Sequence, residues 1–446
     1  MASTYIQYAK GGTDYRTKST ISCWVKRSKL GVQQDIWSWG ENNSSDAYLR
    51  FDTADNIEMH CDGAGGSFNS TSLYRDVNGW FHLVFSLDGS NSTANMRRRF
   101  WINGVQIDEG SGKNDIAAFS AAVIGWHSTQ DFWVGARARS QQAGDLEYFD
   151  GLISHFHYCS NYSYAASDFG ETDATTGEWK IKASPNVQYG SEGFFLKMEN
   201  SSNMDLDSSG NNKTLTTSGT LTKTEDSPSN VFATINPLVR TVSTPSFNAG
   251  NNTVSSSAGA YQNHFSTIGM TGSGKYYWEM KVNGTANSAM FFGISSDIEM
   301  NNLITVSNVV GYTSTGYTLV ASSGNKYNNT NSTSYGSALT NGEIMMGALD
   351  LDNGKIWYGK NGTWFNSGNP ASGSNEAFSG ISASNVYFVS GTVYDGGYGS
   401  VNYNFGNGYF ETTAVSSAGT NASGNGIFEF NVPTGYTALS TRGLNL

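Results

Sequence analysis

The stretch from Gly342 to Phe365, GEIMMGALDLDNGKIWYGKNGTWF, reads as three consecutive antiparallel strands joined by two tight turns. Asp352–Gly354 forms the first turn and Lys360–Gly362 the second. Asn and Gly tolerate the positive φ that such turns require, and apolar or aromatic residues flank both turns. This meander predicts an all-β sandwich with Trp357 and Trp364 at its core or rim.

The composition of the whole chain agrees with that prediction. Its 446 residues exceed one ordinary core, so two domains of roughly 200 residues each are expected. Charged residues make up only 14%, whereas aromatics reach 13% and glycines number 52, which suits short strands joined by tight turns. No apolar period of 3.6 residues is sustained. The sequence therefore predicts two antiparallel β-sandwiches in tandem.

Two further motifs precede the meander in the C-terminal half. They are GKYYWE at residues 274–279 and FFGI at residues 291–294. With the meander, these motifs resemble the SPRY domain in content and order. The resemblance covers about the whole C-terminal half. It implies a bent β-sandwich that binds partners through its loops and is not an enzyme.

The first half repeats the strand signature. Strand patterns occur at residues 21–26, 35–40, 48–51, 80–88, 99–105, 132–135 and 149–156. Residues 21–26 alternate as a half-exposed strand does. Residues 1 to 158 resemble a concanavalin A-like, LamG-type jelly roll, through the motifs around Trp24, Trp80, Trp101 and Phe149.

Domain limits follow from composition. A strand at residues 193–198 is expected to return to the first sandwich, after a short helix near Ser167. Residues 203–230, rich in Ser, Thr, Asn and Asp, are expected to be a surface link. We therefore expect a jelly roll at 1–202, a linker at 203–230 and a SPRY-like sandwich at 231–446. The two halves share no repeat that aligns.

Charge and cysteine content restrict the partners. The net charge of −11 disfavours binding to nucleic acid or to anionic membranes, and no apolar run approaches membrane-spanning length. Cys23, Cys61 and Cys159 lack CxxC spacing and are expected to be small core residues. The N-terminus lacks the pattern of a signal peptide, so synthesis without export is expected.

Catalysis is not expected. Glycoside hydrolysis usually needs two carboxylates on the sugar-facing sheet, and no E-x-D-x-E pattern occurs. Asp350 and Asp352 have the spacing but end a strand, where Asp352 is expected to accept turn amides. Glu147 and Asp150 have the wrong phase for one face. The sequence predicts no catalytic residue and no enzyme.

No metal site is predicted either. His155 and His157 flank Phe156 and are expected on one face of a strand, yet no third ligand is evident nearby. LamG relatives often carry calcium in their loops. That resemblance leaves calcium as an open alternative to the prediction of no cofactor, with loop candidates at Asp62, Asp131 and Asp145.

The aromatic residues are the remaining candidates for function. The strand tryptophans are expected in the core: Trp24, Trp80, Trp101, Trp278 and Trp357. Loop residues are better candidates for ligand binding, because a ring presents an apolar face and a polar tip. They are Tyr74, Arg75, Trp126, His127, Tyr312, Tyr317, Tyr327, Tyr335, Tyr394, Asp395 and Tyr398. The alternative for each is a ring packed beneath its own loop.

Three phrases point to a biological setting: DSSGNN, DSPSNVFATINPL and VPTGYTAL. They resemble phrases in structural proteins of marine tailed bacteriophages. The resemblance implies a non-enzymatic virion protein, made in the host cytoplasm, that adheres to host-surface glycan or protein. Its other partners would be virion proteins, with many copies per particle. Two alternatives stay open, a passive capsid or tail assembly or decoration protein without receptor binding, and a polysaccharide depolymerase.

Overall fold

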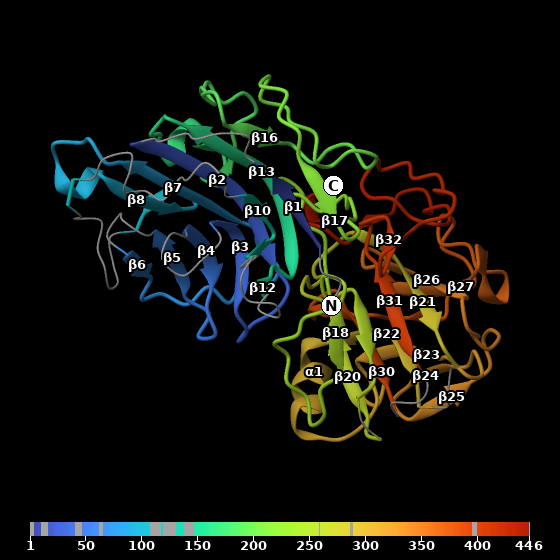
Figure 1. Cartoon of the computed structure of the whole chain (residues 1–446). Coiled ribbons are helices and arrows are strands. Elements are labelled where there is room, and N and C mark those ends of the chain that lie inside the picture. Colours follow the sequence, from blue (N-terminus) through green and yellow to red (C-terminus); the bar gives the residue numbers. More distant parts are fainter. Residues whose placement is uncertain are drawn as a thin grey trace. The chain divides into compact units, whose positions relative to one another are not determined.

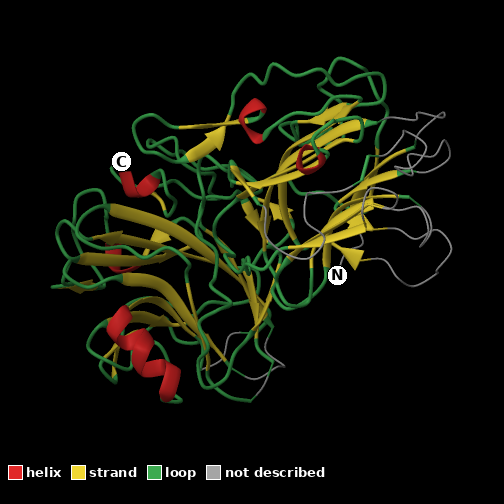
Figure 2. Cartoon of the chain, turned by 90° about the vertical axis from the view of Figure 1, so that its left-hand side faces the viewer, coloured by secondary structure: helices red, strands yellow, loops and turns green. Residues whose placement is uncertain are grey.

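The computed structural model describes residues 4–9, 17–40, 47–61, 66–107, 117–118, 131–137, 147–257, 259–285, 289–394 and 399–445. Contacts along the chain separate two compact units, Met1–Lys223 and Thr224–Leu446. Strands dominate both units (Figures 1 and 2). Among the described residues, α1 (Asp297–Thr305) is the single α-helix. The predicted all-β fold is confirmed.

Two antiparallel sheets form the first unit. One has the order β17-β1-β10-β3-β4-β5-β6 and the other β16-β13-β2-β7-β8-β9. The first comprises β1 (Tyr5–Tyr8), β3 (Gln34–Trp39), β4 (Ala47–Phe51), β5 (Ile57–Cys61), β6 (Gly66–Asn69), β10 (Phe132–Val134) and β17 (Thr216–Ser218). The second comprises β2 (Lys18–Arg27), β7 (Phe81–Asp88), β8 (Arg98–Ile102), β9 (Val105–Gln106), β13 (Gly151–Ser160) and β16 (Phe194–Leu196). Apolar side chains from both sheets fill the core between them.

The segment after residue 160 completes the first unit. β16 pairs with β13, as predicted for a strand that returns to the first sandwich. β17 lies within the stretch expected as a surface link, and it pairs with β1. The hairpin β14 (Gly170–Thr172) and β15 (Trp179–Ile181) follows a 3₁₀ turn, Ala166–Asp168, at the place where a short helix was expected. A small sheet pairs β11 (Ala136–Arg137) with β12 (Glu147–Tyr148).

The expectation of a half-exposed strand at residues 21–26 is wrong. All residues of β2 after Lys18 are buried, Lys26 included. The outer face of its sheet carries a second apolar cluster that includes Trp101, Phe169 and Trp179. Residues 164–189 contribute most of that cluster, and they come too late in the sequence for a local pattern to reveal this cover.

Two larger sheets form the second unit. One follows the order β18-β19-β31-β21-β26-β27-β28, with β29 and β34 attached, and the other follows β20-β30-β22-β23-β24-β25. The first comprises β18 (Ser246–Asn248), β19 (Thr253–Ser255), β21 (Lys275–Asn283), β26 (Ile344–Asp350), β27 (Lys355–Lys360), β28 (Thr363–Trp364), β29 (Phe378–Ser379), β31 (Ser400–Asn404) and β34 (Thr437–Ala438). The second comprises β20 (Gln262–Phe265), β22 (Phe291–Ser296), β23 (Gly316–Val320), β24 (Lys326–Asn328), β25 (Asn331–Thr333) and β30 (Tyr387–Val393). A short hairpin pairs β32 (Tyr409–Phe410) with β33 (Thr413–Ala414).

The predicted meander is confirmed as β26, β27 and β28. Its second turn places Asn361 at φ 48° and Gly362 at φ 83°, both positive as in a type I′ turn. The role assigned to Asp352 is wrong. Asp350 accepts the turn amide of Asn353 at 3.0 Å, whereas Asp352 accepts the backbone N–H of Gly274 at 2.8 Å. The reason is that β26 ends at Asp350, whose carboxylate therefore lies at the base of the turn.

The buried residues predicted from strand patterns are confirmed. All five strand tryptophans are buried, and Trp364 is half-buried at the rim. The three cysteines are free and buried. No helix in the described part of the chain is both long and apolar enough to cross a membrane.

Gln34 offers a test of the first core. Its side chain is 1% exposed, and neither amide atom has a hydrogen-bond partner among the described residues. Gln34→Met keeps the shape and removes two unpaired polar atoms, so we expect the free energy of unfolding of the first unit to rise by about 1–3 kcal/mol. Urea unfolding measures the change. The exposed control Gln188→Met should shift it by less than about 0.5 kcal/mol.

Candidate functional site

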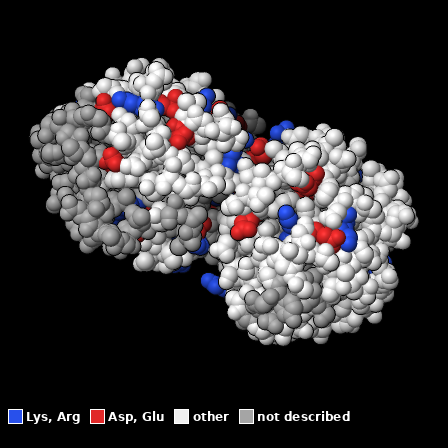
Figure 3. Space-filling model, turned by 45° about the vertical axis from the view of Figure 1, so that its right-hand side comes forward, with Lys and Arg blue, Asp and Glu red and all other residues white. Residues whose placement is uncertain are grey.

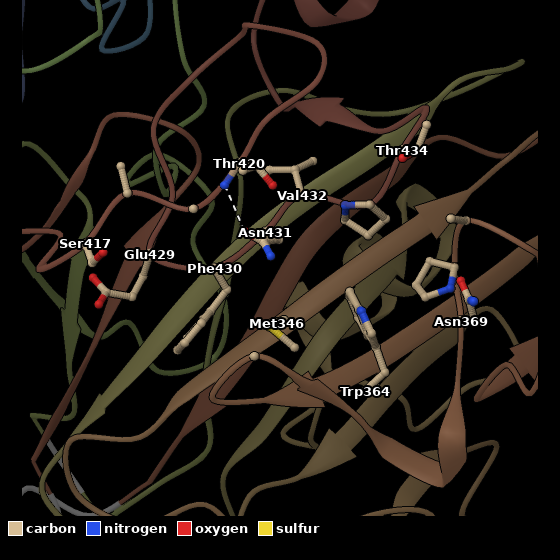
Figure 4. A pocket seen from close by; sticks show the side chains of 16 residues that line it. Met346, Trp364, Asn369, Ser417, Thr420, Glu429, Phe430, Asn431, Val432 and Thr434 are labelled. Carbon is tan, nitrogen blue, oxygen red and sulfur yellow. Dashed lines mark hydrogen bonds between the residues drawn. The ribbon is translucent and has the colours of Figure 1, made fainter.

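A groove that encloses about 680 Å³ lies on the outer face of the β26-β27-β28 meander (Figure 4). Its walls come from the meander, from the loop after β28 and from two C-terminal segments. The lining residues are Met346, Gly362, Trp364, Asn369, Pro370, Ala371, Ser417, Ala418, Gly419, Thr420, Glu429, Phe430, Asn431, Val432, Pro433 and Thr434. In Figure 4 the side chains of Phe430, Met346 and Trp364 stand in one row across the strands.

The floor of the groove exists because β26 is apolar on both faces. Met345 and Leu349 belong to the core between the sheets, whereas Met346 and Ala348 belong to a cluster on the outer face. Successive strand residues point to opposite faces, so a continuous apolar run needs cover on both sides. The cover on the outer face is the C-terminal segment, through Phe428, Val432, Tyr436 and Ala438.

Glu279 on β21 holds one wall in place. Its carboxylate is 0% exposed and accepts backbone N–H groups from Glu429 at 2.9 Å and Phe430 at 2.8 Å. The Tyr277 hydroxyl and the Asn404 amide also donate to it, at 2.9 Å and 3.2 Å. Burial raises the pKa of Glu279 to about 7, although these four hydrogen bonds act to lower it. Tyr277 and Glu279 both come from the GKYYWE motif.

Two half-buried aromatic rings flank the groove. Trp364 meets Tyr277 edge-on, with ring centroids 6.3 Å apart. Phe430 lies against the turn at Gly362, where an added Cβ would be 3.0 Å from its ring. Glycine is therefore required at position 362 for two reasons, the positive φ of the turn and the close approach of the Phe430 ring.

Gly362→Ala should destabilise the second unit by about 2 kcal/mol, through the strained φ and the displacement of Phe430. Gly342 makes a matched control, since its φ is 84° and nothing lies within 4 Å of an added Cβ. Gly342→Ala carries only the strain, so about 1 kcal/mol is expected. Urea unfolding compares the two. Equal losses would show that Phe430 does not press on this turn.

Two asparagine side chains are fixed at the groove in the same way. Asn431 Oδ1 accepts the Thr420 N–H at 2.8 Å, and Asn369 Oδ1 accepts the Ser372 N–H at 3.2 Å. A backbone N–H only donates, so each amide must turn its oxygen to the protein and its NH₂ group away. Among the described residues, neither NH₂ group has a hydrogen-bond partner.

Glu429 is the single charged residue among those that line the groove. Its carboxylate accepts the backbone N–H of Ser416 at 2.6 Å and also the hydroxyl of Ser416. Both oxygens are therefore engaged within the protein. No Lys, Arg or His belongs to the described lining.

The candidates predicted from the first half do not form one site. Tyr74 packs edge-on against Phe81, and its carbonyl accepts Arg27 at 2.6 Å. Arg75 pairs with Asp55 at 2.9 Å. These contacts tie Tyr74 to β7 and β2, and Arg75 to the turn between β4 and β5. Trp126 and His127 lie outside the described residues.

The candidates from the second half divide into two groups. Tyr335 lies between strands and packs on the main core beneath its loop, whereas Tyr317, also predicted between strands, lies in β23 and packs against the same core. Tyr327 lies in β24 and not between strands, and it contacts Phe291 edge-on, with ring centroids 4.9 Å apart. Tyr394 contacts Tyr261, with ring centroids 5.3 Å apart. None of these tyrosines lines the groove, and Asp395 and Tyr398 lie outside the described residues.

Sequence reasoning missed Asn369, Glu429, Phe430 and Asn431. Trp364 was noted as a core or rim residue, and the VPTGYTAL phrase starts beside the groove at Val432. A signal that could have found the site is the meander itself. Its two-faced apolar pattern in β26 requires a cover, and the C-terminal segment is available to provide it.

The histidine pair considered for a metal sits at an irregularity. The register of β13 against β2 shifts between Ser154 and His157, and His155 has φ 49°. His157 stacks on Phe195 with ring centroids 3.9 Å apart. In the part of the chain that the structure describes, no group of three or more His, Cys, Asp or Glu could hold a metal. Of the calcium candidates, Asp131 bonds Gln7, and Asp62 and Asp145 lie outside that part.

Comparison with known families agrees with this architecture. A model for the concanavalin A-like lectin/glucanases superfamily, of laminin G type, matches residues 1–168, and a model for the SPRY domain matches residues 275–396. The chain is a concanavalin A-like jelly roll followed by a SPRY domain. Laminin G and SPRY domains are typically non-catalytic binding domains. The groove lies on the second unit, Thr224–Leu446, which contains the residues matched to the SPRY domain and is called the SPRY unit below.

Several solved structures resemble parts of this jelly roll–SPRY chain. The SPRY domain of human HERC1 is 22% identical, with 34% of this chain and 87% of that chain covered and a TM-score of 0.27. Domains LG4-5 of the mouse laminin alpha1 chain are 8% identical, with coverages of 90% and 84% and a TM-score of 0.26. A SAP-like pentraxin from Limulus polyphemus is 12% identical, with coverages of 36% and 78% and a TM-score of 0.24. Comparison with curated proteins gave no match.

Proposed function

We propose that this chain is a non-enzymatic adhesion protein of a tailed phage particle that binds host-surface glycan or protein. Two tandem domains of binding type support the binding role. The groove on the SPRY unit carries the proposal, because it combines aromatic rings with fixed amide groups that have no partner among the described residues. The virion setting rests on the phrases that resemble those of phage structural proteins, and many copies per particle would supply avidity to weak contacts.

Binding of the purified full chain to host cells tests this function. Fluorescently labelled protein should sediment with host cells at several salt concentrations and should not sediment with cells stripped of their envelope polysaccharide and surface protein. Absence of binding to intact cells would overturn the adhesion role. Release of new reducing ends from envelope polysaccharide would instead establish a depolymerase.

A passive assembly or decoration role is the second candidate. Three exposed apolar residues on and after α1 favour it, namely Ile298, Ile304 and Val306. Such residues suit a protein–protein contact. Deleting the gene separates the two roles. Particles that form but fail to adsorb support adhesion, whereas particles that fall apart support assembly.

A further inference from the structure

We propose that the groove of the SPRY unit binds an uncharged glycan, a short run of hexose or N-acetylhexosamine units. This inference rests on the proposed adhesion function and names its ligand. Three features of the groove support this ligand, namely its charge, its hydrogen-bonding groups and its aromatic surfaces.

Charge argues against an anionic ligand. Phosphate, sulfate and carboxylate groups are bound in proteins mainly by Arg, Lys or aligned backbone amides. The sixteen described lining residues include no basic side chain, and their one carboxylate, Glu429, is already bonded to Ser416. On the face drawn in Figure 3, charged side chains are sparse and scattered over a mostly uncharged surface. With a net charge of −11, the chain also repels anions at long range.

The hydrogen-bonding groups favour a ligand rich in acceptors. The NH₂ groups of Asn369 and Asn431 are turned away from their own backbone partners by the oxygens that those partners require. Trp364 adds an indole N–H that has no partner among the described residues. Ring oxygens, hydroxyls and acetamido carbonyls of sugars accept from such donors. Because the oxygens are tied down, the donors are pre-positioned and little entropy is lost on binding.

The apolar surfaces fit the faces of pyranose rings. Trp364, Phe430, Pro370 and Pro433 line the groove beside those donors. Aromatic rings combine apolar area with rigidity, and the C–H faces of sugars pack on them. The volume of about 680 Å³ falls within the range of about 300–1,000 Å³ that small-ligand pockets occupy. A ligand of several sugar units therefore fits this groove.

Two isosteric variants test the inference without disturbing the fold. Asn369→Asp and Asn431→Asp keep the oxygen that accepts the internal N–H, and they replace the outward NH₂ donor by a negatively charged acceptor. Asn236→Asp is the matched control, since Asn236 accepts the Leu238 N–H at 2.9 Å in the same unit but does not line the groove. Thermal unfolding should confirm that all three variants stay folded.

Isothermal titration of the full chain uses defined probes. They are triacetylchitotriose, cellotriose, maltotriose, the anionic sialyllactose and a neutral proline-rich peptide. We expect at least one uncharged trisaccharide to bind with little dependence on salt, and to bind at least tenfold more weakly to either groove variant than to Asn236→Asp. Binding only of sialyllactose or of the peptide would overturn the inference, as would equal binding by the groove variants and the control.

Cell binding distinguishes this inference from the function on which it rests. If the full chain sediments with host cells and both groove variants do so equally well, the adhesion role stands and the groove inference fails. If the full chain binds no cells, the adhesion role itself fails. Loss of cell binding in the two groove variants but not in Asn236→Asp supports both.

Discussion

Glu279→Leu is expected to lower the free energy of unfolding of the second unit by about 3–5 kcal/mol. The change leaves the backbone N–H groups of two half-buried residues, Glu429 and Phe430, without their acceptor. It also removes the acceptor for Tyr277 and Asn404. Urea unfolding measures the loss. Hydrogen exchange should show faster exchange in residues 429–434, because the groove wall is no longer held.

Glu279→Gln should be intermediate, with a loss of about 1–3 kcal/mol. A glutamine offers one acceptor oxygen, so its NH₂ group must face one of the two backbone donors. Glu343→Gln is the control, because Glu343 also accepts a backbone N–H, from Thr340, but lies near the surface. Its loss should stay below about 1 kcal/mol. A Glu279→Leu variant with the same free energy of unfolding as the unmodified chain would contradict this account of the groove wall.

The raised pKa of Glu279 gives a further readout. Its ordinary value of 4.5 rises to about 7 in the folded unit, so the folded state holds an extra proton between these values. The pH-dependent part of the stability that Glu279 contributes is therefore fully present below about pH 4.5 and is lost as the pH rises through 7, by roughly 3 kcal/mol, whereas the hydrogen bonds to its carboxylate remain. Comparing Glu279→Gln with the unmodified chain across this window isolates that slope.

Acid should destabilise the first unit through its buried histidines. On the outer face of the second sheet, His82 stacks on Trp24 with ring centroids 4.7 Å apart. The Trp179 indole N–H donates to its Nδ1 at 2.9 Å, and Ser22 bonds its Nε2 at 2.9 Å. An indole N–H only donates, so Nδ1 must stay unprotonated for this bond. Burial and the nearby His155 lower the pKa of His82 to about 3.

The neighbours of His82 act in the same direction. Burial also lowers the pKa of His155 and of His157, with His82 and His155 adding repulsion at His157. His157 is enclosed by Phe195, Phe169 and Tyr189. The charged groups that act on His155 are Glu199, which raises its pKa, and Lys197, which lowers it. Protonation of the buried rings of His82 and His157 therefore requires this cluster to open.

The lowered pKa values of these histidines decide whether acid raises or lowers the free energy of unfolding. Because an unfolded histidine takes up its proton near pH 6.5, the unfolded state binds more protons than the folded one below that pH. The stability linked to these neutral histidines is therefore fully present above pH 6.5 and falls as the pH drops. For His82 alone the loss is about 2 kcal/mol between pH 6.5 and pH 5. Asp35 acts in the opposite sense, since burial and Glu147 raise its pKa well above the ordinary range.

Hydrogen exchange of the full chain between pH 7 and pH 4.5, corrected for the intrinsic exchange rate, measures the effect. Protection of residues 170–181 should fall first, because Trp179 closes this hairpin onto His82. His82→Phe keeps the stacking and should flatten the pH dependence of these peptides. His264→Phe, at a buried histidine of the second unit, is the control and should leave them unchanged. Protection that stays constant down to pH 4.5 would contradict the prediction.

Much of the fold could be predicted because its signals are local. The Asn361–Gly362 turn follows from the φ values that these residues tolerate, and the strand tryptophans follow from alternation. The candidate site could not be predicted in that way. Trp364 and Phe430 are 66 positions apart, and Glu279 is 150 positions before Glu429, which it holds. No short pattern connects residues at that separation.

The loop tyrosines illustrate the same limit. A tyrosine between strands carries no local sign of whether its ring faces outward or packs inward. Tyr335 packs inward on the core, whereas Tyr312 is partly exposed. The difference depends on which segments pass above each ring, and those segments are distant in sequence.

By itself, the sequence determined the class of fold, the order of the two domains, the turns and the residues that alternate into the cores. These features depend on backbone sterics and on a side-chain period of two, both of which act over a few residues. Only the tertiary structure decided that a C-terminal segment covers the outer face of β26 and that a buried carboxylate holds it there. The physical reason is that burial of a second apolar face is satisfied by whatever chain can reach it, and distance along the sequence does not limit that reach.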